Sequence, residues 1–268
     1  MMLRLIKIDF KKYFYSKVFW VMTGIYAALL LMVFFGAEKL VNGVLANAST
    51  SAPVTMPGFT LYSFPYVWQN LAFFAGFLKI FLALIVLFFI TNEFSNKTMR
   101  QNIMNGMSRN QFILSKLIFV ILLSLASAAI LFVSGLILGL SYTEEYTTAL
   151  ALQKAIFIPA YFLEVLTFSI MAMFIAFLVK RSILAIGALA LYSYIIEPII
   201  SGSIPDSVAK FLPGEAIGNL IDIPNSALMK MFGVSFRENV SPLDAIACLF
   251  YCCLFTGLIF LFYRRKDI

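Results

Sequence analysis

The sequence predicts an all-α integral membrane protein with six membrane-spanning helices. Of its 268 residues, 62% are hydrophobic and 12% are charged, whereas soluble domains contain about 45–50% apolar and about 25% charged residues. The apolar residues fall into runs of about 20 or more, the length at which a helix crosses a bilayer. The basic residues gather at the ends of these runs, so the net charge of +7 indicates membrane orientation and not nucleic-acid binding.

Six apolar runs organise a single transmembrane domain over residues 1–268. Ahead of the first run, residues 2–17 carry apolar and basic side chains at helical spacing, which predicts an amphipathic helix in the membrane interface. A polar elbow at residues 91–111 separates the second and third runs, and a longer polar segment at 201–242 precedes the sixth. The membrane spans are predicted at residues 18–37, 66–90, 112–140, 155–179, 182–200 and 243–263.

The distribution of basic residues orients the chain, because short cytoplasmic loops of membrane proteins are rich in Lys and Arg. With both termini in the cytoplasm, most of the 20 Lys and Arg residues fall on that side. They lie in the N-terminal segment, the elbow, the tight Lys180-Arg181 turn and the C-terminus. The same orientation places the segment 201–242 outside, where residues 206–221 and 225–232 are predicted to form short helices.

The elbow itself has the pattern of a short helix, a stop and a new helix. Asn92 or Asn96 can cap the short helix, and Gly106 can end it in a left-handed conformation. Ser108 followed by Gln111 indicates a capping box that opens the next helix. The alternative is an ordinary cytosolic loop whose charges only set the topology.

Three charged residues lie in or near the predicted spans: Lys79, Glu164 and Glu197. Charges inside a membrane are costly and are functional candidates by default. One hypothesis is that Lys79 pairs with one of the glutamates across a helix interface, or that these residues line a substrate cavity. The other is that they reach the interface or serve only helix packing.

Small residues four positions apart occur twice in the third span. Ser124 with Ala128, and Gly135 with Gly139, have the spacing that lets two helices approach closely. We interpret both pairs as packing features.

The residue inventory excludes most enzyme classes. The absence of histidine removes zinc-hydrolase and Ser-His-Asp chemistry. Cys248, Cys252 and Cys253 share one apolar run, so they are interpreted as small buried side chains. There is no G-x-x-x-x-G-K-[ST] phosphate loop, and ATP is therefore not bound by that route. We expect no enzymatic activity, no catalytic residue and no directly bound cofactor or metal.

The elbow and the topology together resemble the permease subunits of type-2 ATP-binding-cassette (ABC) transporters. In that family the loop between spans two and three opens with an acidic residue, matched here by Glu93. The common Ser-Arg before span three is matched by Ser108 and Arg109. Lys97-Thr98 stands where the family often has Gly-Thr, which is a departure from the motif. The resemblance in topology covers essentially the whole chain.

The resemblance implies partners. The permease would pair with a second copy of itself or with a homologous permease in the lipid bilayer of a bacterial cytoplasmic membrane. Each elbow would seat in a groove on a separate ABC ATPase subunit, two copies of which would bind ATP and Mg. The short outside helices would form a re-entrant or capping element above the translocation path.

The residues assigned to these roles fall into two groups. The expected contacts with the ATPase subunit are Glu93, Lys97, Met99, Arg100, Ile103, Met104 and Arg109. The expected capping element contains Phe211, Leu212, Pro213, Ile217 and Leu220.

The function expected from the resemblance is export of an amphipathic or apolar substrate (a peptide, lipid or drug-like molecule), driven by a separate ATPase. The alternative is an ion-coupled secondary transporter or channel that uses Lys79, Glu164 and Glu197. A third interpretation is a structural or assembly protein of the membrane.

Overall fold

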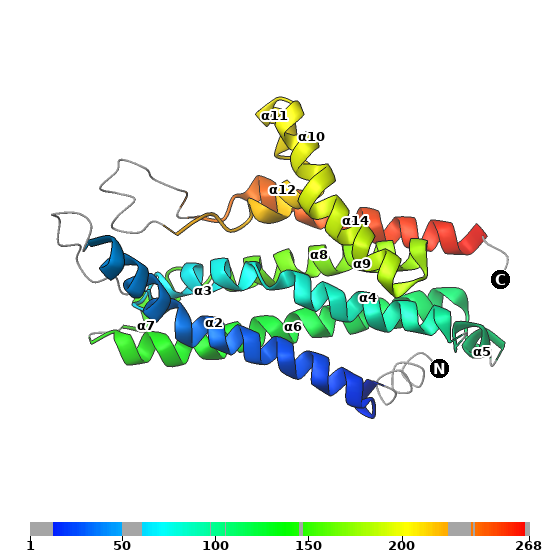
Figure 1. Cartoon of the computed structure of the whole chain (residues 1–268), viewed down its shortest axis with the longest axis horizontal. Helices are drawn as coiled ribbons and strands as arrows, with labels where there is room; N and C mark the ends of the chain where they lie inside the picture. Colours follow the sequence, from blue (N-terminus) through cyan, green and yellow to red (C-terminus); the bar gives the residue numbers. More distant parts are fainter. Residues whose placement is uncertain are drawn as a thin grey trace.

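The computed structural model describes most of the chain as a bundle of helices (Figure 1). The described residues are 13–49, 61–96, 98–104, 106–144, 147–224, 237 and 239–265. Most of the predicted interfacial helix at 2–17, and all of the predicted short helix at 225–232, lie outside them. Within the described part of the chain all regular structure is helical, as the sequence predicts.

The helices follow one another with few long connections. They are α2 (Lys17–Ser49), α3 (Val67–Gly76), α4 (Lys79–Ser95), α5 (Thr98–Met104), α6 (Arg109–Tyr142), α7 (Thr148–Leu152), α8 (Phe157–Val179), α9 (Ser182–Leu191), the π-helical turn η1 (Tyr192–Ile196), α10 (Glu197–Ser203), α11 (Asp206–Ala209), α12 (Pro213–Gly218) and α14 (Pro242–Arg265).

The number and order of the membrane spans agree with the prediction. Five described stretches are long and apolar enough to cross a bilayer on their own, and α3 with α4 makes a sixth when the pair, bent by 47° between them, is counted as one span. The five stretches are Lys17–Gly36, Arg109–Tyr142, Thr148–Val179, Ser182–Ser203 and Pro242–Tyr263.

Two helices continue past the predicted ends of their spans. The first was expected to end at residue 37, yet α2 runs to Ser49, because its continuation is rich in Ala, Leu and Val and contains no proline. The second was expected to end at residue 90, yet α4 runs to Ser95. Asn92 therefore lies inside α4, and Asn96 caps its C-terminus, so the prediction that either residue opens the elbow helix is wrong.

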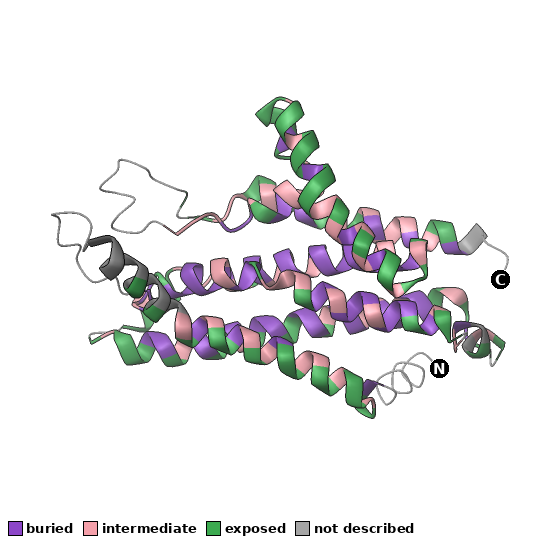
Figure 2. Ribbon diagram, viewed as in Figure 1, coloured by how far each residue is buried: buried purple, intermediate pink, exposed green. Residues whose placement is uncertain are grey.

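Helix α8 is the centre of the bundle. It contacts α3, α4, α6, α9, α12 and α14, and Figure 2 shows buried residues along much of its length. Val165, Ala172 and Met173 are fully buried. Helices α2 and α14 lie at the periphery, and much of their surface is exposed (Figure 2).

The start of α2, the elbow helix α5 and the end of α14 lie at one end of the bundle (Figure 1). This arrangement fits the prediction that both termini and the elbow share one side of the membrane. The Lys180-Arg181 turn belongs to the same end, because the hydroxyl groups of Ser182 and Thr91 lie 2.6 Å apart. Lys180 ends α8 in a left-handed conformation with φ of 59°, which produces the tight turn expected from the sequence.

The small residues of the third span permit close packing of α6. A Cβ atom on Gly135 would lie 2.5 Å from the ring of Trp68, and one on Gly139 would overlap the ring of Phe64. The packing interpretation of these two glycines is therefore confirmed.

Candidate functional site

The break between α3 and α4 brings a lysine and a glutamate together. Gly76 ends α3, and a Cβ atom at this position would lie 2.9 Å from a carboxylate oxygen of Glu164. The chain turns at Phe77 and Leu78, and Lys79 is the first residue of α4. Because Gly76 has no side chain, the Glu164 carboxylate of α8 can approach the break closely.

Lys79 and Glu164 form an ion pair with a separation of 2.7 Å between Nζ and Oε1. The Glu164 residue is 4% exposed, and the Lys79 ammonium also lies 5.8 Å from the centre of the Phe168 ring. A charge in an apolar environment is costly unless it is paired. The structure thus selects Glu164 as the partner of Lys79, which the sequence left open between two glutamates.

Glu197 has a different set of contacts. Its carboxylate accepts hydrogen bonds from the backbone amides of Gly214 and Glu215, the latter at 3.0 Å. These amides belong to the first turn of α12, whose N–H groups have no helical partner. The Glu215 side chain in turn accepts from the Ser201 hydroxyl at 2.9 Å. Two carboxylates therefore fasten α12 to α10.

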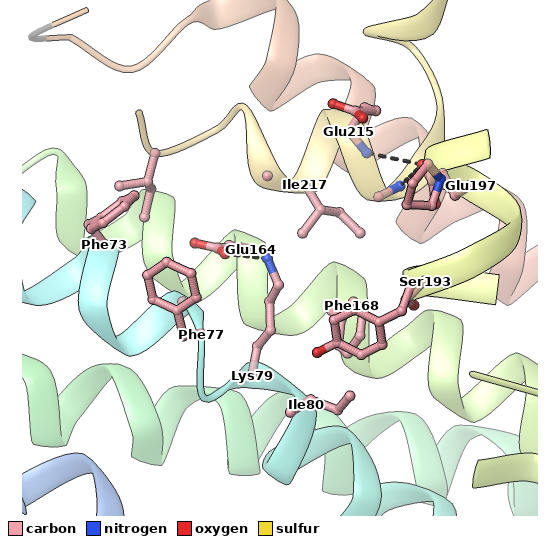
Figure 3. A pocket seen from close by; sticks show the side chains of 16 residues that line it. Phe73, Phe77, Lys79, Ile80, Glu164, Phe168, Ser193, Glu197, Glu215 and Ile217 are labelled. Carbon is pink, nitrogen blue, oxygen red and sulfur yellow. Dashed lines mark hydrogen bonds and ion pairs between the residues drawn. The ribbon is translucent and has the colours of Figure 1, made fainter. Parts of the chain in front are cut away.

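All three charged residues predicted from the sequence line one cavity of about 340 Å³. In Figure 3 the Lys79 side chain reaches toward Glu164, with Phe77 on one side and Phe168 on the other. The cavity lies between the α3–α4 break, α8, the η1–α10 segment and α12. Its walls are formed by Phe73, Gly76, Phe77, Lys79, Ile80, Glu164, Phe168, Ser193, Tyr194, Glu197, Pro198, Gly214, Glu215, Ile217, Gly218 and Ile221.

The residues expected to form a capping element occupy α12 and its approaches. Ile217 and Leu220 are buried, and Ile217 faces the cavity. Leu212 and Pro213 are half-buried, whereas the Phe211 side chain is exposed and its carbonyl accepts a hydrogen bond from the Tyr251 hydroxyl. The predicted helix 206–221 is divided into α11 and α12 at Pro213, because proline starts a helix readily and interrupts one that precedes it.

The elbow contains the short helix, stop and capping box that its sequence indicates. Helix α5 is followed by Gly106 with φ of 92°, and Ser108 opens α6. The Ser108 side chain accepts from the Gln111 amide, while the Gln111 side chain accepts from the Ser108 amide. This capping box fixes where the third span begins.

A buried ion pair fixes the base of the elbow. The Lys116 ammonium of α6 lies 2.8 Å from the Glu93 carboxylate of α4. The Tyr13 hydroxyl donates to the same carboxylate and accepts from Lys116. Thr98, the first residue of α5, donates its hydroxyl to the Glu93 carbonyl at 3.1 Å. Tyr13 also joins the N-terminal segment to this cluster.

Lys116 and Tyr13 were not among the residues predicted to form a site. The signal for Lys116 was present, because it lies four residues inside the predicted span 112–140 and meets the same criterion as Lys79. Tyr13 carries no such signal, since its role depends on how the N-terminal segment meets α4 and α6.

The residues expected to contact an ATPase differ widely in exposure. Glu93 is 2% exposed and Met99 is also buried, so both face the interior of this chain. Ile103 is half-buried and packs against the core. Met104 is 78% exposed, and Arg109 donates a hydrogen bond to the Tyr263 carbonyl at 3.2 Å. Arg100 belongs to α5, and Lys97 lies outside the described residues.

Within the described residues, no group of three or more Cys, Asp and Glu side chains is arranged to hold a metal ion. The cavity combines an ion pair, further carboxylates and aromatic rings, an arrangement suited to binding and not to covalent chemistry.

The helical bundle, the broken span with its cavity and the capped elbow define a multi-pass membrane transport subunit. The family model described as "ABC-2 family transporter protein" matches residues 3–268. The chain therefore belongs to the ABC-2 family of transporters and is a permease subunit of that class. None of the curated proteins compared with the chain matches it. The family assignment favours the permease interpretation over the ion-coupled transporter or channel.

Proposed function

We propose that this permease exports an amphipathic or apolar molecule from the cytoplasmic membrane of a bacterium. The proposal rests on the family assignment and on the cavity between α3, α4, α8, α10 and α12. Its walls combine aromatic and aliphatic side chains with an ion pair and two further carboxylates, as in sites that bind small amphipathic ligands. The substrate enters this cavity, and closure of the bundle moves it outward.

The energy for transport enters through the elbow. Two copies of a separate ABC ATPase bind ATP and Mg, and each contacts one α5 helix. The observation that carries this assignment is the exposed Met104 side chain on a short helix whose base is fixed by Glu93 and Lys116. A methionine adapts its shape to a groove, while the buried pair transmits a displacement of α5 to α4 and α6.

The residues first assigned to the ATPase contact divide into three roles. Met104 and Arg100 contact the ATPase, together with the more exposed part of Ile103 and with Lys97. Glu93 and Met99 hold α5 against its own bundle, because both side chains are buried. Arg109 joins the start of α6 to the end of α14. Two permeases, identical or homologous, form the complete transport pathway.

The test is coexpression of the tagged permease with each ABC ATPase of the source cell, followed by purification and an ATP hydrolysis assay. Met104→Glu should reduce recovery of the ATPase subunit, because it places a charge in an apolar contact. Met104→Leu should retain it. Leu152→Glu is the matched control, since Leu152 is also exposed on a short helix, at the opposite end of the bundle (Figure 1). Undiminished recovery with Met104→Glu would refute the assigned contact.

A further inference from the structure

The cavity contains more carboxylates than ammonium groups. Glu164, Glu197 and Glu215 line it, whereas Lys79 is the only basic residue among its lining residues. One oxygen of Glu164, Oε2, has no hydrogen-bond partner within the described part of the chain. The same holds there for the buried hydroxyl oxygen of Ser193. The cavity therefore has more carboxylates than ammonium groups, and it has buried oxygens whose hydrogen-bonding capacity is unused.

These acceptors are not distributed evenly among the carboxylates. Glu197 Oε2 is likewise without a partner among the described residues, but Glu197 Oε1 accepts hydrogen bonds from two amides of α12, and Glu215 accepts from Ser201. Glu164 is 4% exposed and has only the Lys79 ammonium on its other oxygen. A buried acceptor without a donor is unfavourable. A ligand with a charged N–H group would donate the hydrogen bond that Glu164 Oε2 lacks.

The aromatic walls suit the same kind of ligand. Phe73 and Phe77 pack edge to face with their centres 5.2 Å apart, and both line the cavity. Phe168 on the other wall lies within 5.8 Å of the Lys79 ammonium. Faces of aromatic rings attract cations, and their apolar surface accommodates hydrocarbon. The walls thus accept both the charged head and the apolar body of an amphipathic cation.

We propose that this cavity binds the primary ammonium group of an amphipathic organic cation. The ammonium donates a hydrogen bond to Glu164 Oε2, and the apolar part lies against the Phe73 and Phe77 rings. As a substrate site this rests on the proposed transport function, but binding of the amine does not. The volume of about 340 Å³ accommodates an amine with one fused ring system and a short chain. Anions are excluded by the three carboxylates.

Lys79 competes with the ligand for Glu164. Substitution of Lys79 and substitution of Glu164 should therefore have opposite effects on ligand binding. Glu164→Gln removes the charge that the ligand binds. Lys79→Gln removes the internal cation that competes for Glu164 and leaves the carboxylate for the ligand. If the pair only stabilised the fold, both substitutions would weaken binding together.

The experiment measures binding of dansylcadaverine, a fluorescent primary amine, to the permease in nanodiscs. The discs contain phosphatidylcholine and phosphatidylglycerol, neither of which has a primary amine, and empty discs give the background. N-acetylated dansylcadaverine is the neutral control ligand. Glu144→Gln is the control variant, because Glu144 is exposed and does not line the cavity. Addition of phosphatidylethanolamine then tests whether an amine carried by a lipid competes with the free amine.

The expected results are specific. Glu164→Gln binds the amine about tenfold more weakly, since a charge-assisted hydrogen bond is lost. Lys79→Gln binds it about threefold more tightly because an internal competitor is removed. Glu144→Gln binds like the wild type, and the acetylated ligand binds no better than to empty discs. Competition by phosphatidylethanolamine identifies a lipid as a source of the amine, and its absence assigns the site to free amines.

Two results would overturn the proposal: equal binding of the amine and its acetylated form, or unchanged amine binding by Glu164→Gln. Failure of the transport proposal appears separately, as a permease that binds the amine but recovers no ATPase subunit. Each variant is therefore also tested for ATPase recovery, which the cavity substitutions leave unchanged.

Discussion

The ammonium of Lys116 and the carboxylate of Glu93 lie 2.8 Å apart with both side chains almost completely buried. They join the end of α4 to the start of α6 on either side of the elbow. The Lys116 ammonium also lies 5.2 Å from the centre of the Tyr13 ring and 5.0 Å from that of Phe112. The two spans that carry α5 are therefore held together by charge at their base.

Loss of either member of this pair should destabilise the protein strongly. Glu93→Gln or Lys116→Met alone leaves one buried charge without its partner, which costs about 3–5 kcal/mol. The double variant removes both charges and should recover most of the loss. The measurement is the thermal unfolding midpoint of the purified permease in one detergent, with Glu144→Gln as the exposed control. A double variant no more stable than the worse single one would contradict this account.

Exchanging the two charges of the Lys79–Glu164 pair should destabilise the protein less than reversing only one of them. Lys79→Glu puts a second carboxylate beside Glu164, and Glu164→Lys puts two ammonium groups in one buried place. Each single variant should show reduced expression and thermal stability, because like charges repel strongly in an apolar surrounding. The combined variant should regain part of both. Equal losses in the single and combined variants would show that the pairing contributes nothing to stability.

Glycine positions on α6 and α9 should respond oppositely to the same substitution. Gly135→Ala brings a Cβ atom against the Trp68 ring, so either the ring or α6 must shift; overpacking of this kind costs about 1–3 kcal/mol. Gly187→Ala meets no atom within 4 Å, and alanine favours a helix over glycine by roughly 0.5–1 kcal/mol. Thermal unfolding of the two variants measures the difference. Similar midpoints would argue against close contact of α6 with α3.

The capping box at the start of α6 should stabilise that end of the helix locally. Ser108→Ala removes the acceptor for the Gln111 amide and should cost about 0.5–2 kcal/mol. Hydrogen exchange of the first turn of α6 should become faster, while exchange at its other end stays the same. Ser141→Ala is the matched control, because the Ser141 hydroxyl only bonds back to the Ile137 carbonyl within the helix. Unchanged hydrogen exchange in Ser108→Ala would show that the Ser108 cap does not stabilise the first turn of α6.

Most of the fold could be predicted from the sequence because a bilayer imposes strong rules on length, hydropathy and charge. Local signals were also sufficient for the Ser108–Gln111 capping box and the Gly106 stop. The helix ends were less certain. Residues after Thr91 look polar enough for a loop, yet Glu93 belongs to α4 since its charge is neutralised by Lys116, a residue far along the chain.

The candidate site could be predicted only in part. The cost of charge in a membrane identified Lys79, Glu164 and Glu197, but the choice of Glu164 as the partner depends on the bend at Phe77 and Leu78. Glu197 binds the amides of α12, and backbone amides carry no sequence signal. The sequence also could not show that Glu93 and Met99 face the interior, because the packing of the elbow on α4 decides which of its faces is buried.

The π-helical turn η1 makes the orientation of Glu197 depend on the number of residues in that turn. The amide of Glu197 donates to the carbonyl of Tyr192, one residue further back than in an α-helix. Deleting one residue from this turn would restore α-helical bonding and rotate everything after it by about 100° relative to α9. The Glu197 carboxylate would then point away from Gly214 although every lining residue type remained. Among relatives, a one-residue gap at this turn would mark a rearranged cavity, and an altered choice of cargo, more reliably than a substitution would.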